Sequence, residues 1–174
     1  AAFERLRILC AMRQGFLGVE NLNRLMQRLL NVRTAERGYP VMITVNDYTL
    51  RLFNGDVGLT LPDTNGTLKV FFPDPDNPGG YRSFAPATLP PNEPVFAMTV
   101  HKAQGSGFGE VLLVLPKRDT PVLTREWVYT GITRSRNRCT IWAERNVWEQ
   151  ALSRVTVRMS GLIEKLTGGR CETV

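Results

Sequence analysis

Short apolar runs alternate with amphipathic stretches at both ends of the chain, and this pattern predicts alternating strands and helices. Nearly continuous apolar runs, typical of strands buried on both faces, occur at Leu6–Met12, Val95–Val100, Val111–Leu115 and Cys139–Ala143. Helical spacing or a helix-start signal predicts helices at Val19–Arg33, at Asn146–Arg154, and from Thr124, as N-cap, to about Arg134, with weak helical character at Met159–Leu166. The pattern predicts an α/β domain whose parallel sheet is covered on both faces.

The middle of the chain follows a different pattern. Between Gly38 and Pro91, helical spacing is largely absent and turn signals are frequent. Asn54-Gly55 and Asn65-Gly66 are typical of hairpin turns because both residue types tolerate positive φ. Strands are predicted at Val41–Val45, Val57–Leu61, Leu68–Phe72 and Tyr81–Leu89. We interpret this segment as a small all-β, barrel-like module inserted into the α/β domain.

Length and composition narrow the class of protein. The 174 residues suit one domain with a small insert, and 43% hydrophobic with 22% charged residues exclude a disordered or collagen-like chain. No apolar run approaches the ~20 residues that cross a bilayer, and no signal peptide is recognisable. We therefore expect a cytoplasmic protein without a membrane partner. The missing initiator Met leads us to expect an excised fragment.

The charge of the chain is basic and dominated by arginine. Lys+Arg number 22 against 16 Asp+Glu, and 18 of the basic residues are Arg. Arginine matches phosphate oxygens with its rigid fork, so nucleic acid or a nucleotide is a plausible partner; a bias in codon composition explains the excess equally well. Three scattered cysteines and one histidine predict no metal site and a reduced, cytosolic protein.

A polar segment directly after a predicted strand carries the densest set of functional side chains. Within eight residues it offers Thr99, His101, Lys102, Gln104, Gly105 and Ser106. Hydroxyls and backbone donors, one ammonium group and a glycine suit contact with phosphate oxygens at the carboxyl end of a parallel strand. The alternative is an ordinary polar loop in which Thr99 and Gln104 satisfy nearby backbone groups.

Arginines near the end of the helix predicted to begin after Thr124 form a second candidate group. Arg134, Arg136 and Arg138 crowd this helix C-terminus, where each cation stabilises the helix dipole by roughly 0.3–1 kcal/mol. One of them would instead serve as an arginine finger on the γ-phosphate of a nucleotide. Arg13 follows the first strand and is a third candidate, although by itself it is more typical of a solvated surface residue.

Taken together, these segments resemble known helicase motifs. His101-Lys-Ala-Gln-Gly-Ser106 and Tyr129-Thr-Gly-Ile-Thr-Arg134 resemble motifs V and VI of superfamily 1 DNA helicases. Cys10-Ala-Met-Arg-Gln-Gly15, Phe53-Asn-Gly-Asp-Val-Gly58 and Ala97-Met-Thr-Val-His-Lys102 resemble, in order and spacing, segments of the RecD family, the alpha subunits of exodeoxyribonuclease V (RecBCD). The resemblance covers nearly the whole chain and weakens in 62–91 and after 154.

The resemblance implies a fold and a role for single residues. Residues 1–37 and 92–174 would form a second RecA-like domain, and 38–91 an inserted SH3-like β-barrel. Arg134 would contact the γ-phosphate of ATP as arginine finger, with Arg13 as a second phosphate-sensing arginine. The other implied nucleotide contacts are Gln104 and Gly105, and the implied DNA contacts are Thr99, His101, Lys102, Ser106 and Asn54.

The chain departs from the family pattern in ways that bear on nucleotide binding. The family usually carries Glu in a Gly-Ser-Glu-Phe run where this chain has Gly107, so contact with the ATP ribose is in question. No GxxxxGK[ST] phosphate loop and no acidic Walker B strand occur, so the chain alone should bind no ATP or Mg²⁺ and hydrolyse no ATP. Both cofactors would belong to the full-length parent.

The implied partners are single-stranded DNA, an upstream RecA-like domain, and RecB- and RecC-like subunits. The implied activity is 5′→3′ DNA unwinding in double-strand break repair and recombination. Two alternatives stay open: a non-enzymatic DNA-binding or assembly module, and a stand-alone RecD-like helicase. A nuclease is disfavoured because no Asp/Glu cluster has the spacing of a two-metal site.

Overall fold

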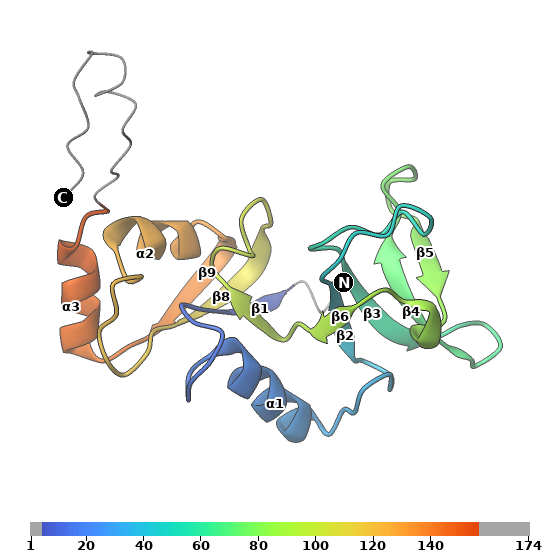
Figure 1. Cartoon of the computed structure of the whole chain (residues 1–174), viewed down its shortest axis with the longest axis horizontal. Coiled ribbons are helices and arrows are strands. Elements are labelled where there is room, and N and C mark those ends of the chain that lie inside the picture. The colour runs from blue at the N-terminus through green and yellow to red at the C-terminus, as the bar shows by residue number, and fades with distance from the viewer. Residues whose placement is uncertain (1–4, 157–174) are drawn as a thin grey trace, which may run out of the picture.

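A computed structural model describes residues 5–156, which form two β-sheets lying side by side (Figure 1). Within this range the first sheet has four strands in the order β7-β1-β8-β9, and all neighbouring strands are parallel. Their bounds are Ala97–Thr99 for β7, Leu6–Cys10 for β1, Phe108–Val114 for β8 and Ser135–Trp142 for β9. The predicted α/β fold with a parallel sheet is therefore confirmed.

Helices cover both faces of this sheet, as the apolar strands predicted. The described helices are α1 (Val19–Leu30), α2 (Arg125–Ile132) and α3 (Arg145–Ser153). Side chains alternate along β1: Ile8 and Cys10 pack with α1, whereas Leu9 packs in the core that α2 and α3 share with the opposite face. Figure 1 shows α1 and α2 on opposite sides of the sheet.

The second sheet is antiparallel, and within the described residues it has five strands in the order β5-β4-β3-β2-β6. The strands are β2 (Pro40–Ile43), β3 (Val57–Pro62), β4 (Leu68–Pro73), β5 (Tyr81–Phe84) and β6 (Asn92–Pro94), with a 3₁₀ helix at Pro86–Thr88. A separate core that includes Ile43, Leu52 and Phe72 supports it. Gly66 has the positive φ of 80° expected of the β3–β4 hairpin turn. An SH3-like barrel stays a prediction, as does the division of the chain into domains.

The crossing between the two sheets divides a strand that the sequence predicted as one. Instead of a continuous strand Val95–Val100, the chain leaves β6 at Pro94 and enters β7 at Ala97. The Val95 N–H donates to Pro40 in the antiparallel sheet, while the next carbonyl, of Phe96, accepts from Ile8 in the parallel sheet. Hydrogen bonding to different sheets on successive residues prevents a single strand.

The predicted end of the helix that begins after Thr124 is also corrected. Helix α2 ends at Ile132, and β9 begins at Ser135 rather than Cys139. Arg136 and Arg138 therefore lie in a strand and do not crowd the helix C-terminus. Strand β9 is at the edge of its sheet and mostly exposed, so it tolerates polar side chains that a search for apolar runs overlooks. The predicted weak helix at Met159–Leu166 lies outside the described residues. No helix within 5–156 is long and apolar enough to cross a membrane.

Helix α2 begins as the sequence predicted, and its first turn also holds the end of the described chain. The Thr124 hydroxyl accepts a hydrogen bond from the Trp127 N–H at 3.2 Å. The backbone N–H and hydroxyl of Thr156 donate to Glu126 Oε2 at 3.0 and 2.8 Å. Hydrogen bonds from the Glu126 N–H and from Thr156 lower the pKa of the Glu126 carboxyl from 4.5 to about 2.

This depressed pKa predicts a pH-dependent contribution to stability. The ionised Glu126 carboxylate stabilises the fold fully above the ordinary pKa of 4.5, and the stabilisation is lost as the pH falls towards 2. We expect Glu126→Gln to lower the melting temperature at pH 7 and to match the wild type near pH 2. Thermal unfolding across this range measures it, with Glu149→Gln, an exposed carboxylate on α3, as control. A melting difference that is constant with pH contradicts the prediction.

Candidate nucleotide and nucleic-acid site

The segment between β7 and β8 is a succession of tight turns anchored at its centre. The Thr99 hydroxyl accepts from the Lys102 N–H at 3.2 Å, and the Ala103 N–H donates to the Thr99 carbonyl at 3.1 Å. Ala103 is fully buried, which fixes the middle of the loop against the core. Gly105 has a φ of +83°, which suits glycine. Around this anchor, the loop exposes His101, Lys102, Gln104, Gly105 and Ser106.

The alternative of an ordinary polar loop is correct for Thr99 but not for Gln104. Thr99 does satisfy a local backbone group, so its hydroxyl supports the turn. The Gln104 side chain makes no hydrogen bond within the described part of the chain. The loop thus combines a structural residue at its start with exposed polar side chains along its course.

Arg134 follows α2 and joins the turn before β9 to this loop. Its guanidinium donates from Nη1 to the Ser106 carbonyl at 3.2 Å, from Nε to the Thr130 carbonyl at 3.2 Å, and from Nη2 to the Thr133 hydroxyl at 3.3 Å. All these acceptors are uncharged, and Arg134 forms no ion pair with any residue in 5–156. The guanidinium is therefore oriented while its positive charge is not neutralised.

Arg13 and Lys102 meet at a carboxylate that sequence analysis missed. Glu93, on β6, accepts from Arg13 Nη2 at 2.9 Å through Oε2 and from Lys102 Nζ at 2.7 Å through Oε1. Burial alone would raise the pKa of Glu93, but the hydrogen bonds and charges of Lys102 and Arg13 outweigh it and lower that pKa. Glu93 is 80 residues from Arg13 in the chain, so no local motif signals the contact.

The two predicted phosphate-contacting arginines lie in separate clusters. Arg134 precedes β9, whose Ser135 is level with Phe108 at the start of β8. Arg13 follows β1, whose Cys10 is level with Val114 at the end of β8. The backbones of the two arginines therefore lie at opposite ends of the parallel strands. The loop reaches both clusters, through Lys102 at one and Ser106 at the other.

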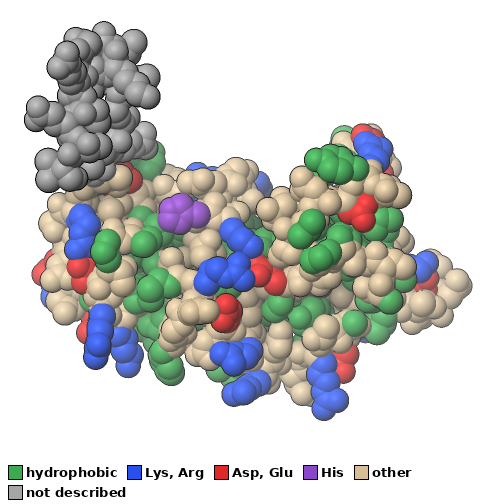
Figure 2. All heavy atoms as spheres, in the orientation of Figure 1, with side chains coloured by type: hydrophobic (Ala, Val, Ile, Leu, Met, Phe, Trp, Pro, Cys, Tyr) green, Lys and Arg blue, Asp and Glu red, His purple; other side chains and the backbone are tan. Residues whose placement is uncertain are grey.

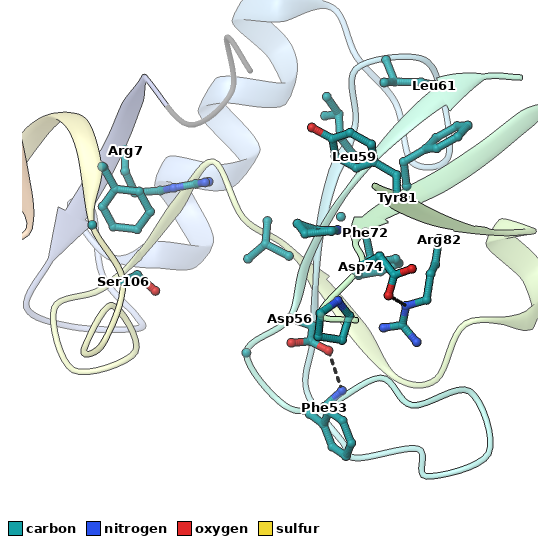
Figure 3. Close-up of a pocket in the computed structure, with 18 of the residues that line it drawn as sticks. Arg7, Phe53, Asp56, Leu59, Leu61, Phe72, Asp74, Tyr81, Arg82 and Ser106 are labelled. Atoms are coloured by element: carbon teal, nitrogen blue, oxygen red, sulfur yellow. Dashed lines mark hydrogen bonds and ion pairs between the residues drawn. The ribbon is translucent and has the colours of Figure 1, made fainter. Parts of the chain in front are cut away.

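A cleft of about 770 Å³ opens between the two sheets. Figure 3 shows Arg7 and Ser106 on the side of the parallel sheet, facing Asp56, Leu59 and Tyr81 from the antiparallel sheet. Exposed aromatic rings at its wall come from Phe53 and Tyr81. Its basic side chains belong to Arg7, Arg51, Arg82 and Arg136.

The basic side chains of the cleft differ in how they are held. Arg82 donates to the carbonyls of Leu50 and Arg51 at 3.2 and 3.0 Å, which makes it a support of the loop before β3. Arg51 pairs with Asp76 at 2.8 Å. Arg136 makes no hydrogen bond or ion pair with the described residues. Its cation is therefore available to an anionic ligand.

Two sequence features can be placed at this cleft. A Cβ on Gly107 would lie 3.1 Å from Arg136 Nε, so the guanidinium occupies space next to the position where the family usually carries Glu. Asn54 lies between Phe53 and Gly55, which line the cleft, and its N–H donates to Asn46 Oδ1 at 2.8 Å. Asn54 thus lies beside the cleft in a turn, and its contact with DNA stays a prediction.

Neither metal ligation nor thiol chemistry is supported at these sites. Residues 5–156 contain no group of His, Cys, Asp or Glu arranged to hold a metal ion. Burial raises the pKa of the Cys10 thiol to about 12, so this cysteine is inert in the core. The chemistry that the side chains at these sites support is the binding of anions by oriented cations. Figure 2 shows Lys and Arg side chains gathered over the middle of one face, beside acidic ones.

Comparison with known proteins places this arrangement among helicase C-terminal domains. The family model described as "UvrD-like helicase C-terminal domain" matches residues 94–142, which contain the loop, α2, Arg134 and β9. A Bacteroides Pif1 helicase, solved in complex with ADP-AlF3 and ssDNA, shares the fold with a TM-score of 0.53 at 16% identity over 94% of this chain and 44% of that one. A structure of Pif1 helicases at forked dsDNA gives a TM-score of 0.54 at 15% identity, over 95% of this chain and 44% of that one.

Curated relatives narrow the family further. The RecBCD enzyme subunit RecD of Haemophilus influenzae is 42% identical over 92% of this chain and 25% of its own length. The same subunit of Mycolicibacterium smegmatis is 37% identical over 95% and 30%. The ATP-dependent RecD2 DNA helicase of Deinococcus radiodurans is 36% identical over 92% and 23%. The chain belongs to the RecD-like superfamily 1 helicases, as their C-terminal domain, and spans less than a third of the length of these relatives.

Proposed function

We propose that this chain is the second RecA-like motor domain, with an inserted SH3-like barrel, of an ATP-dependent 5′→3′ DNA helicase subunit of exodeoxyribonuclease V. It would act in double-strand break repair and recombination with RecB- and RecC-like subunits. ATP and Mg²⁺ would bind where this domain meets an upstream RecA-like domain of the same polypeptide. Because the described residues offer no cluster of metal ligands, Mg²⁺ would be held by that upstream domain.

The observation that carries the proposal is the state of Arg134. Its guanidinium is held by uncharged oxygens, including the Ser106 carbonyl at 3.2 Å, and has no carboxylate partner within 5–156. An oriented, uncompensated guanidinium is suited to the charge that develops on a γ-phosphate during transfer. The loop residues Gln104 and Gly105 lie next to Ser106 and would complete the nucleotide contacts from this side.

The contact between Arg134 and the Ser106 carbonyl would also couple nucleotide binding to DNA binding. Movement of Arg134 towards a γ-phosphate would pull on the Ser106 carbonyl, and with it on the loop that starts at Thr99. His101 and Lys102 are exposed on this loop and would contact the sugar-phosphate backbone of single-stranded DNA. Closing on ATP and reopening after hydrolysis would therefore alter the grip of this domain on DNA.

The cleft between the sheets would extend the DNA path. Exposed aromatic rings beside arginines are the combination that binds single strands, because bases stack on the rings and phosphates pair with the cations. Phe53, Tyr81 and Arg136 provide this combination, and Asn54 lies at the edge. The cleft supports binding without sequence preference.

We expect Tyr81→Ala to weaken binding of single-stranded DNA by about 5- to 150-fold, because one stacked base is worth roughly 1–3 kcal/mol. The measurement is fluorescence anisotropy of a labelled oligo(dT) with the 174-residue chain. Tyr129→Ala is the matched control, since Tyr129 is 69% exposed but lies on α2 outside the cleft. Equal affinity of the two variants would exclude the cleft as a stacking site.

ATP turnover by the full-length polypeptide, with and without single-stranded DNA, tests the proposed function. A motor domain requires turnover that DNA stimulates, whereas a passive DNA-binding or assembly module binds DNA without turnover. The identity to the RecD2 DNA helicase favours a second candidate, a helicase that works alone. Unwinding measured with and without RecB- and RecC-like subunits separates the two helicases.

A further inference from the structure

Glu93 connects the turn before α1, 80 residues earlier in the chain, with the β7–β8 loop, where Lys102 is 9 residues further on. Glu93 lies on β6, the strand that carries the chain from the antiparallel to the parallel sheet. One carboxylate oxygen accepts from Arg13 in the turn before α1, and the other accepts from Lys102 in the β7–β8 loop. The Glu93 side chain is 22% exposed, against 53% for Arg13, so the carboxylate is the sheltered member of the pair.

The cluster holds two cations and one carboxylate, and this excess of positive charge makes it responsive to a bound anion. Two cations share one carboxylate, so a stronger anion can take one cation away while Glu93 keeps the other. A phosphate matches the guanidinium fork of Arg13 better than the compact ammonium of Lys102. Arg13 is also the more exposed cation, at 53% against 32% for Lys102. Phosphate is therefore expected to withdraw Arg13 first.

We propose that Glu93 is a positioning residue that couples nucleotide state to the DNA grip of Lys102. Without nucleotide, Glu93 divides its carboxylate between Arg13 and Lys102. When a nucleotide phosphate engages Arg13, the carboxylate turns wholly to Lys102 and withdraws its ammonium from the DNA backbone. Nucleotide binding thereby weakens this DNA contact. The inference rests on the proposed function for the contact of Lys102 with DNA, and on the contact of Arg13 with phosphate that the family resemblance implies.

The test measures the affinity of the full-length polypeptide for oligo(dT), with and without a non-hydrolysable ATP analogue. The wild type should bind DNA more weakly with the analogue. Glu93→Gln should bind DNA more tightly in both states. The ratio of its affinity without the analogue to its affinity with the analogue should fall by at least about fivefold, the lower end of the usual range of coupling between sites. The salt dependence of its binding should steepen by about one counterion, since Lys102 is released to phosphate.

Asp63→Asn is the matched control. Asp63 also pairs with a lysine, Lys69 at 3.0 Å, but it lies in the β3–β4 turn away from both clusters. The control loses the same charge and should keep the wild-type ratio. Lys102→Gln is a second variant, which leaves Glu93 intact. It should lower the ratio of the DNA affinities without and with the analogue by the same factor as Glu93→Gln. Adding Glu93→Gln to Lys102→Gln should not change the DNA affinity further.

The outcomes separate this inference from the proposed function. A wild-type ratio above one that Glu93→Gln leaves unchanged overturns the role of Glu93 and leaves the motor assignment standing. A further change of DNA affinity when Glu93→Gln is added to Lys102→Gln also overturns it, because Glu93 would then act by another route. If the wild type binds DNA equally well with and without the analogue, both the role of Glu93 and the proposed function are overturned.

Discussion

Replacing Arg134 with alanine in the full-length polypeptide is expected to lower DNA-stimulated ATP turnover by about 10³–10⁵-fold, the range for arginine fingers generally. The guanidinium that the variant removes is oriented by Ser106, Thr130 and Thr133, with no ion-pair partner among residues 5–156. Affinity for single-stranded DNA should change little, because the exposed loop side chains would make the DNA contacts.

Steady-state turnover at saturating DNA measures this effect. Arg138→Ala is the control, since it removes the same side chain four residues later, from the exposed face of β9, and should leave turnover near the wild-type level. Arg134→Lys should recover little, because lysine keeps the charge but not the fork of donors. Unchanged turnover in Arg134→Ala, or an equal loss in the Arg138 variant, would refute the role of Arg134.

The second large effect is on stability. Trp127→Ala should lower the free energy of unfolding by about 3–5 kcal/mol, as for other large-to-small changes in cores. Trp127 is 4% exposed in the first turn of α2, in the core that this helix shares with α3 and one face of the parallel sheet. The truncation leaves a cavity that surrounding side chains fill only in part.

Urea unfolding of the 174-residue chain, followed by far-UV circular dichroism, measures this loss. The matched control is Trp142→Ala: Trp142 is 60% exposed on the edge strand β9, so its truncation should cost less than about 1 kcal/mol. Trp127→Phe should lose less than Trp127→Ala because it keeps most of the apolar volume. Equal losses at positions 127 and 142 would contradict the assignment of this core.

The elements that the sequence predicted well are those whose cause is local. The apolar runs around Ile8 and Leu113 predict strands buried on both faces because a parallel sheet between helices has no polar face. Thr124 caps α2 through a contact three residues away, and Gly66 closes a hairpin through its own φ. The helicase resemblance depended on short motifs of the same local kind, and the comparisons confirmed it.

What local pattern left undecided is how these segments meet. A search for apolar runs predicts a start of β9 that is too late, because an edge strand need not be apolar. The same search predicts one strand over Val95–Val100, because neighbouring residues give no sign of pairing with different sheets. The meeting of Arg13 and Lys102 at Glu93, and of Arg134 at the Ser106 carbonyl, depends on strand order. Amino-acid types and their spacing specify strands, helices and caps, since these form between near neighbours. Contacts across 9, 28 and 80 residues arise only once the sheets have packed, and these contacts define the site.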